Sequence, residues 1–284
     1  MNWVLDADIR DFFGSLTHEW LVKFVEHRIG DKRVVRLIQK WLAAGVLEDG
    51  KRVRSEVGTV QGGSVSPLLA NIYLHYVLDL WVQQWRKKQA RGDMVIVRFA
   101  DDFVVGFEHR QEAERFLAEI RERFAQFGLE LHPDKTKIVY CKDANRRGNF
   151  EHTSFDFLGY TFRTRLAHGP RGYFRGFSPA ISNGARTAVG HQIRAWHLNR
   201  RSGSDLSSLA EAINPQLRGW INYYGRFYRS ELRFLAWRID QHLARWAMHK
   251  FKRFRGKFRR AMQWLRKVHQ HQHDLFAHWR LVRP

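Results

Sequence analysis

Two adjacent aspartates lie between two runs of apolar strand-forming residues, in the stretch Val95-Ile-Val-Arg-Phe-Ala-Asp-Asp-Phe-Val-Val-Gly-Phe107. The apolar runs predict strands buried on both faces, with Asp101 and Asp102 in the turn of a hairpin between them. A simple hairpin turn favours Asn-Gly or Asp-Gly, because its backbone needs positive φ at low cost. Two carboxylates side by side repel each other, and they do so more strongly when nearly buried. The pair therefore predicts a bound cation, with a divalent metal ion as the first candidate.

A second acidic strand end, Leu5-Asp-Ala-Asp-Ile-Arg-Asp-Phe-Phe13, supplies further oxygen ligands. Asp6 and Asp8 alternate with apolar residues, so both side chains project from one face of the predicted strand. If this strand lies beside the hairpin, Asp8 reaches the hairpin turn. Carboxylates from two neighbouring strands suit two magnesium ions about 3.5–4 Å apart. The residues alone leave two alternatives open: a hairpin turn with a capping aspartate, or ion pairs with Arg10 and Arg98.

Strand and helix signals alternate through the first part of the chain. Strands are predicted over 3–9, in the hairpin, and over 137–141 and 155–162, and helices over 17–28, 34–44, 66–88 and 111–127. The stretch 50–63 is predicted to be a loop or hairpin. This order is that of a split βαβ sheet with helices packed on one face, which is an α+β fold.

The net charge of +21 is concentrated in the second part of the chain. Residues 160–284 hold 25 Lys and Arg against 5 Asp and Glu, whereas residues 1–159 hold 24 against 23. From residue 184 onward the signal is helical, over 185–199, 206–224, 232–254 and 256–269. Arginine interleaved with tryptophan predicts nucleic acid binding, although a solvated basic face or a surface for acidic lipid stays open. The two parts are predicted to be domains of residues 1–170 and 171–284.

Several classes of protein are excluded by composition. A single cysteine, Cys141, rules out an internal disulfide framework and a cysteine-rich zinc site, and it favours a reducing compartment. No apolar run approaches membrane-spanning length, and the first residues lack the pattern of a signal peptide. We therefore expect a cytoplasmic protein without a membrane partner.

A glycine-rich stretch precedes one predicted helix, Gly58-Thr-Val-Gln-Gly-Gly-Ser-Val-Ser-Pro-Leu-Leu-Ala-Asn-Ile-Tyr-Leu74. Glycines allow the backbone to approach a ligand closely, and a helix amino terminus favours phosphate. On spacing alone, a flexible connector is the stronger interpretation. The stretch becomes informative when it is considered together with the two acidic motifs, between which it lies in the sequence.

The three motifs in this order resemble the palm of reverse transcriptases. The later stretches Gly128-Leu-Glu-Leu-His-Pro-Asp-Lys-Thr-Lys137 and Phe155-Asp-Phe-Leu-Gly-Tyr-Thr-Phe162 continue the resemblance. Within that superfamily the chain resembles the reverse transcriptase/maturases encoded by group II introns. Asn214-Pro-Gln-Leu-Arg-Gly-Trp-Ile-Asn-Tyr-Tyr-Gly225 is similar to their helical thumb, the maturase or X domain. The tail Leu275-Phe-Ala-His-Trp279 resembles the ending of members that lack an endonuclease domain.

The resemblance implies a set of site residues. Asp8 and Asp101 would hold two catalytic Mg²⁺ ions, with Asp102 as the third carboxylate and the backbone carbonyl of Ile9 as a further ligand. Phe13 would crowd the sugar 2′ position of the incoming deoxynucleotide. The remaining assignments are the nucleotide pocket (Gln61, Gly62 and Lys135), the primer grip (Phe157, Leu158, Gly159 and Tyr160) and basic contacts of the thumb with nucleic acid (Arg218, Lys250, Lys252, Arg253, Arg255, Lys257, Arg259 and Arg260).

The activity implied is that of a bacterial RNA-directed DNA polymerase of the group II intron type. A primer 3′-hydroxyl would attack the α-phosphate of a deoxynucleoside triphosphate, and pyrophosphate would leave. The implied partners are an RNA template, intron RNA whose splicing the protein assists, and a DNA primer or target; a homodimer stays open. The alternative is an RNA-binding maturase module without polymerase activity, or a truncated remnant.

The sequence departs from the family pattern in three places. Val60 stands where the family usually has proline before Gln-Gly, and Gly14 stands where aspartate often follows the double Phe. Neither change removes a predicted metal ligand. The fingers region of the family would precede the first strand, so the chain is expected to represent palm and thumb without fingers, as part of a longer protein or as a truncated form.

Overall fold

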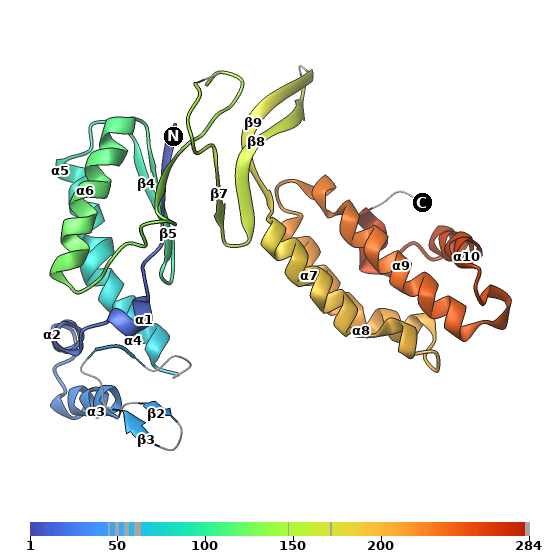
Figure 1. Ribbon diagram of the computed structural model, residues 1–284, viewed down its shortest axis with the longest axis horizontal. Coiled ribbons are helices and arrows are strands. Elements are labelled where there is room, and N and C mark those ends of the chain that lie inside the picture. Colours follow the sequence, from blue (N-terminus) through green and yellow to red (C-terminus); the bar gives the residue numbers. More distant parts are fainter. Residues whose placement is uncertain are drawn as a thin grey trace. The chain divides into compact units, whose positions relative to one another are not determined.

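A computed structural model describes residues 1–44, 46–48, 51–53, 57–59, 64–146, 148–170 and 172–281, with the backbone alone at 46–48 and 51–53. The chain divides into two compact units, Met1–Phe157 and Leu158–Pro284 (Figure 1). Within the described ranges, no helix combines the length and the apolar character needed to cross a membrane.

The first unit combines an antiparallel sheet with helices. Its elements are β1 (Trp3–Ala7), α1 (Phe12–Ser15), α2 (His18–Glu26), α3 (Lys32–Ala43), β2 (Val46–Glu48), β3 (Lys51–Val53), α4 (Ser66–Leu74), η1 (His75–Asp79), α5 (Leu80–Lys88), β4 (Met94–Phe99), β5 (Asp102–Phe107), α6 (Arg110–Gln126), β6 (Lys137–Tyr140) and β7 (Ser154–Phe157). The predicted α+β fold is confirmed.

The main sheet has the strand order β4-β5-β1-β6, and all of its pairs are antiparallel. The first strand therefore lies beside the hairpin, which meets the condition under which Asp8 reaches the hairpin turn. Helices α5 and α6 lie against one side of this sheet (Figure 1). Phe103, Phe107 and Phe116 are fully buried in the core between sheet and helices. Burying aromatic surface of this size stabilises the unit.

The hairpin strands are buried on one face only, which corrects the prediction of burial on both faces. Along β4 the side chains of Val95, Val97 and Phe99 are 49%, 49% and 65% exposed, while Met94 is buried. Side chains alternate across a strand, so these exposed residues share the face that carries Asp102, their neighbour on β5. The sequence pattern suggested burial on both faces because apolar strand-forming residues occupy the solvent-exposed face of the hairpin as well as the face covered by helices.

The helix predicted over 66–88 is interrupted by a π-helix, η1, at His75–Asp79. Such a segment inserts an extra residue into a turn and rotates the following helix face. Along this stretch Tyr73, Leu74 and Leu78 are fully buried, whereas Tyr76, which lies inside the π-helix, is only half-buried.

The second unit opens with a long hairpin and continues with helices. Its elements are β8 (Tyr160–Gly169), β9 (Gly172–Ile181), α7 (Asn183–Ala195), η2 (Leu198–Arg200), α8 (Leu206–Tyr224), η3 (Arg229–Leu232), α9 (Arg233–Lys250), η4 (Lys252–Phe254), α10 (Phe258–His271) and η5 (Ala277–Leu281). The core of this unit gathers Trp246, Phe276 and Trp279 between its helices. The helical expectation for this region is therefore confirmed from residue 183 onward.

The hairpin corrects two expectations. The single strand predicted over 155–162 is two strands, because Leu158 and Gly159 adopt φ angles of 49° and 76° that end β7 before β8 begins. The predicted domain boundary at 170 falls at the tip of the hairpin, where Gly169 pairs with Gly172. The compact units separate instead between Phe157 and Leu158, since β8 and β9 stay together through their backbone pairing.

Candidate active site and nucleic-acid interface

Aspartates from two neighbouring strands converge at one end of the main sheet. The pairing of β1 with β5 sets Ala7 opposite Phe103, so the next antiparallel step sets Asp8 opposite Asp102. The pairing of β4 with β5 ends at Phe99 and Asp102, leaving two residues for the turn. The turn is therefore Ala100-Asp101, and Asp102 opens strand β5, which corrects the prediction that both aspartates lie in the turn.

The turn adopts a strained backbone conformation at Ala100, whose φ is 55°. This left-handed region is disfavoured for residues with a Cβ, and such outliers often mark functional sites. Glycine would avoid the strain, yet the chain carries alanine beside the carboxylate pair. The strain indicates that the position of Asp101 is held by surrounding contacts.

Negative charge is concentrated around Asp102. Burial raises the pKa of the Asp102 carboxyl above its usual range, and the neighbouring charges of Asp101 and Asp8 raise it further. In the described part of the chain, the side chains of Asp101 and Asp102 make no hydrogen bond or ion pair. The site therefore favours an additional positive charge, and the bound cation expected from the sequence stays a prediction.

One lysine already lies at the site. Lys135 Nζ is 2.9 Å from Asp8 Oδ2, and this carboxylate raises the pKa of the Lys135 ammonium. Deeper in the sheet, Lys137 Nζ is 3.7 Å from Asp6 Oδ2. Burial raises the pKa of Asp6 to about 6, although Lys137 opposes that shift. Asp6 is thus paired with Lys137 on the sheet and is separate from the group formed by Asp8, Asp101 and Asp102.

Ion pairs with Arg10 and Arg98 do not account for the aspartates. Arg10 pairs with Glu130 at 3.4 Å. Arg98 forms a bidentate pair with Asp79, with distances of 2.8 and 2.7 Å. The alternative that these two arginines neutralise the carboxylate pair is therefore wrong.

The donor chemistry of the site fits magnesium, which prefers carboxylate and carbonyl oxygens. Within the described ranges, however, no group of three or more His, Cys, Asp or Glu side chains is already arranged to hold a metal ion. Asp8, Asp101 and Asp102 interact through their charges without forming a closed ligand cage. Such a site resembles those in which substrate phosphates complete the coordination shell.

The structure describes some of the other residues that are predicted to contact the metal ions or the nucleotide, and not others. Ile9 is buried and forms an isolated bridge with Leu131. Phe13 is half-buried, packs against Phe12 with ring centroids 5.4 Å apart, and accepts a hydrogen bond from Thr59 N through its carbonyl at 2.8 Å. Gln61 and Gly62 lie outside the described residues.

The residues predicted as a primer grip span the division between the two units. Phe157 ends β7 in the first unit. In the second unit, Tyr223 donates its hydroxyl to the carbonyl of Leu158 at 2.9 Å, and Tyr160 donates its hydroxyl to the carbonyl of Tyr223. These contacts fix the left-handed turn at Leu158 and Gly159 to helix α8.

The predicted basic contacts of the second unit are mostly exposed. They are Arg218, Lys252, Arg253, Arg255, Lys257, Arg259 and Arg260. Phe254 between them is buried, and the Arg253 guanidinium lies 4.7 Å from its ring centroid. Lys250 differs from this set, because its ammonium donates to the carbonyls of Ser202 and Ser204 at 3.0 and 2.8 Å. Lys250 therefore stabilises the fold at this point.

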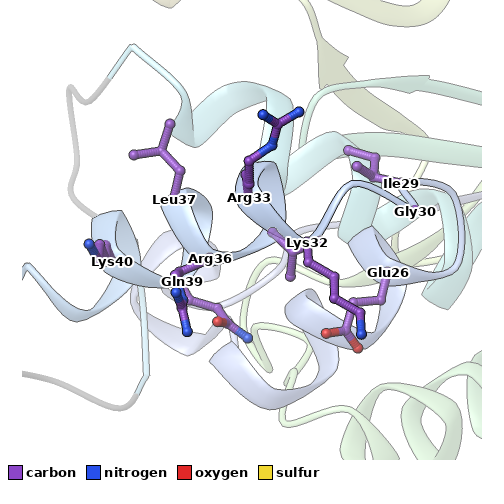
Figure 2. A pocket seen from close by; sticks show the side chains of 10 residues that line it. Glu26, Ile29, Gly30, Lys32, Arg33, Arg36, Leu37, Gln39 and Lys40 are labelled. Carbon is purple, nitrogen blue, oxygen red and sulfur yellow. The ribbon is translucent and has the colours of Figure 1, made fainter.

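Two concavities are also lined by basic residues. One of about 470 Å³ lies between α8 and η5, and it is lined by Arg218, Arg226, Arg229 and Arg280 with a single carboxylate, Asp274. The other, of about 830 Å³, lies along α2 and α3. Figure 2 shows that its labelled side chains come from α3 and from the end of α2 with the turn that follows. None of its described lining residues belongs to the carboxylate site.

Sequence reasoning missed the contacts that support the turn. Arg98, Asp79 and Asn71 form a hydrogen-bonded group behind it. No local sequence pattern predicts that these residues contact one another, since Arg98 is a single polar residue within an apolar strand.

Comparison with known protein families gives two matches that together span most of the chain. Residues 1–162 match the family described as Reverse transcriptase (RNA-dependent DNA polymerase). Residues 186–265 match the family described as Group II intron, maturase-specific domain. The first match contains Asp8, Asp101 and Asp102, and the second contains most of the exposed basic residues.

Individual relatives agree with these matches. The Group II intron-encoded protein LtrA of Lactococcus lactis subsp. cremoris is 27% identical over 302 residues, which cover 79% of this chain and 49% of the relative. Protein YkfC of Escherichia coli (strain K12) is 31% identical over 198 residues, which cover 59% of this chain and 49% of the relative. The chain thus spans about half the length of these curated relatives.

Among solved structures, the telomerase of Candida albicans in complex with a TWJ fragment of telomeric RNA is 14% identical to this chain. The match covers 99% of this chain and 48% of the telomerase chain, with a TM-score of 0.48. A score of this size does not establish a shared fold.

Proposed function

Because the chain belongs to the reverse transcriptase family and carries a group II intron maturase-specific domain, we propose that it is an RNA-directed DNA polymerase that also binds intron RNA. Its substrates would be deoxynucleoside triphosphates, a DNA primer and an RNA template. The observation that carries the proposal is the group of carboxylates of Asp8, Asp101 and Asp102 at one end of the main sheet. The group lies inside the matched reverse transcriptase region, and among the described residues no arginine forms an ion pair with it.

The carboxylates would act as the anionic oxygens that hold two Mg²⁺ ions. When bound, these ions would activate the primer 3′-hydroxyl and offset the charge on the leaving pyrophosphate. Asp8 and Asp101 would supply the main ligands, with Asp102 as the third carboxylate and the Ile9 carbonyl beside them. The strained Ala100-Asp101 turn supports this assignment, because it presents Asp101 on a short, fixed loop.

The nucleotide and primer roles predicted for other residues remain part of the proposal. Phe13 would limit space at the sugar 2′ position, and Gln61 and Gly62 would contact the nucleotide and template base. Lys135, which neutralises Asp8 in the free protein, would move to a substrate phosphate. The turn at Leu158 and Gly159, fixed by Tyr223, would hold the primer end.

RNA binding is proposed for the exposed basic residues of the second unit. Arg and Lys beside aromatic rings suit phosphates and stacked bases, and the charge of this part favours any polyanion. The maturase-specific match supports intron RNA as the natural partner. It also favours, as the second candidate function, RNA binding without DNA synthesis.

Primer extension on an RNA template with Mg²⁺ tests the proposal. We expect the parent chain to synthesise DNA and the Asp101→Ala/Asp102→Ala variant to lose synthesis while it retains salt-sensitive RNA binding. An inactive parent that still binds RNA would favour the binding-module alternative. Loss of synthesis and RNA binding together in the variant would contradict the assignment of the two activities to separate regions.

A further inference from the structure

Arg98 links the Ala100-Asp101 turn between β4 and β5 to helical segments that cover the sheet. Its Nε and Nη2 donate to Oδ1 and Oδ2 of Asp79 at 2.8 and 2.7 Å. Its Nη1 donates to Asn71 Oδ1 at 2.9 Å and to the carbonyl oxygen of Ala100 at 2.8 Å. Only 16% of the Arg98 side chain is exposed, and its two hydrogen bonds to Asp79 are partly buried, where the lower dielectric strengthens them.

The contact with Ala100 bears directly on the strained part of the turn. A positive φ at a residue with a Cβ persists only where the surroundings hold it. Arg98 and Ala100 are two residues apart, and the guanidinium folds back onto the carbonyl of the turn. The side chain therefore holds the backbone immediately before Asp101.

The other contacts attach this guanidinium to two helical segments. Asn71 lies on α4, and its Nδ2 donates to the carbonyl of Pro67 in the first turn of that helix at 3.0 Å. Asp79 is the last residue of the π-helix η1, where its carboxylate also lies 3.6 Å from His75 Nδ1. π-helices occur often at functional sites, and here the segment carries the acceptor for Arg98.

We infer that Arg98 is a positioning residue, which fixes the Ala100-Asp101 turn against α4 and η1 and thereby holds the Asp101 carboxylate in place for DNA synthesis. The inference rests on the proposed polymerase function. Arginine is needed because its planar fork donates two parallel hydrogen bonds to a carboxylate and still has donors for Asn71 and Ala100. A lysine keeps the charge but cannot make this set of contacts.

Steady-state primer extension compares Arg98→Lys with a matched control, Arg123→Lys. Arg123 also contacts η1, donating to the carbonyls of Val77 and Tyr76 at 3.2 and 3.3 Å, but its contacts do not reach the turn. We expect Arg98→Lys to lower kcat by about 10- to 100-fold with KM for the deoxynucleotide and Kd for primer–template nearly unchanged, since a small misplacement of a reacting group has that effect. The control is expected to keep kcat within about twofold at a temperature well below unfolding.

A double-variant cycle tests whether Asp79 acts through Arg98. Asp79→Asn alone should lower kcat, and the double variant Arg98→Lys/Asp79→Asn should be no worse than the more impaired single variant, within about twofold. Multiplying effects in the double variant would overturn the inference, because the two residues would then act independently.

Hydrogen exchange gives a measurement that does not depend on synthesis. Backbone amides of residues 99–103 should exchange about tenfold faster in Arg98→Lys than in the parent or in Arg123→Lys, because the turn loses its support. Unchanged exchange, or a loss of kcat that only follows a lowered unfolding temperature, would overturn the positioning role. If the parent makes no DNA, the polymerase proposal fails, and the exchange measurement alone decides the role of Arg98.

Discussion

Lys135 neutralises Asp8: its ammonium nitrogen lies 2.9 Å from Asp8 Oδ2, although the two residues are 127 positions apart. The contact provides a nearby positive charge for a carboxylate group that otherwise lacks one in the described part of the chain. In the function proposed above, this ammonium would compete with a metal ion for the same oxygen. Under the same proposal, substrate and metal would replace this contact.

Lys135→Ala is expected to make the protein more responsive to magnesium. Without the ammonium, Asp8, Asp101 and Asp102 repel one another, so the unfolding temperature should fall in EDTA and rise more steeply with added Mg²⁺ than in the parent. Thermal unfolding with and without Mg²⁺ measures this difference. Lys23→Ala is the control, since Lys23 pairs with Glu19 at 2.7 Å on the exposed face of α2. An equal Mg²⁺ response in parent and Lys135→Ala would contradict the idea that lysine and metal compete.

Gly159→Ala should destabilise the second unit. Gly159 has a φ of 76°, and a Cβ there would lie 3.1 Å from Tyr224 Oη. A left-handed conformation costs an L-residue about 1–2 kcal/mol, so the free energy of unfolding should fall by at least about that amount. Urea unfolding of the full chain measures the change. Gly203→Ala serves as the control, because nothing lies within 4 Å of its added Cβ. Equal stability of the two variants would show that the turn relaxes without cost.

Cys141 should resist alkylation in the folded protein. Cys141 is 4% exposed, and burial raises the pKa of its thiol to about 11. Since the thiolate is the reactive form, labelling with a thiol reagent at pH 8 should be slow in buffer and fast in guanidinium chloride. Raising the pH toward 11 should speed the reaction of the folded chain, because more thiolate forms. Rapid labelling at pH 8 without denaturant would mean that the segment around Cys141, just after β6, opens readily.

Arg259→Gln/Arg260→Gln should weaken RNA binding in a salt-dependent way. Each phosphate contact contributes roughly 0.7–0.9 to the slope of log K against log salt, so loss of both should reduce the slope by about 1–2. Fluorescence anisotropy over a salt series gives the slope. Lys250→Ala is the contrasting variant: its ammonium holds the carbonyls of Ser202 and Ser204, so it should lower stability more than the salt slope. A full parental slope in the double variant would exclude these arginines from the RNA contact.

The sequence by itself determined the strands and helices whose pattern lies in residues that are close together along the chain. The apolar runs around the Asp-Asp pair predicted the β4–β5 hairpin, and helical spacing predicted α6 (Arg110–Gln126) within a residue of each end. The alternation of Asp6 and Asp8 with apolar residues predicted that both project from one face of the first strand, and the order of strands and helices allowed this strand to lie beside the hairpin, as it does. These predictions succeed because a strand or helix repeats its burial pattern every two or every 3.6 residues, and the pattern is written in consecutive residues.

Only the tertiary structure decided which charges meet and where the regular elements break. The sequence leaves open an ion pair between Arg98 and the aspartates of the turn, yet Arg98 pairs with Asp79, because the alternation of side chains along β4 directs it to the helix-covered face of the sheet. The π-helix at His75–Asp79 and the left-handed turn at Leu158 and Gly159 likewise follow from packing against distant residues. Contacts such as that of Lys135 with Asp8 join positions that no local window contains, so their chemistry appears only when the chain is folded.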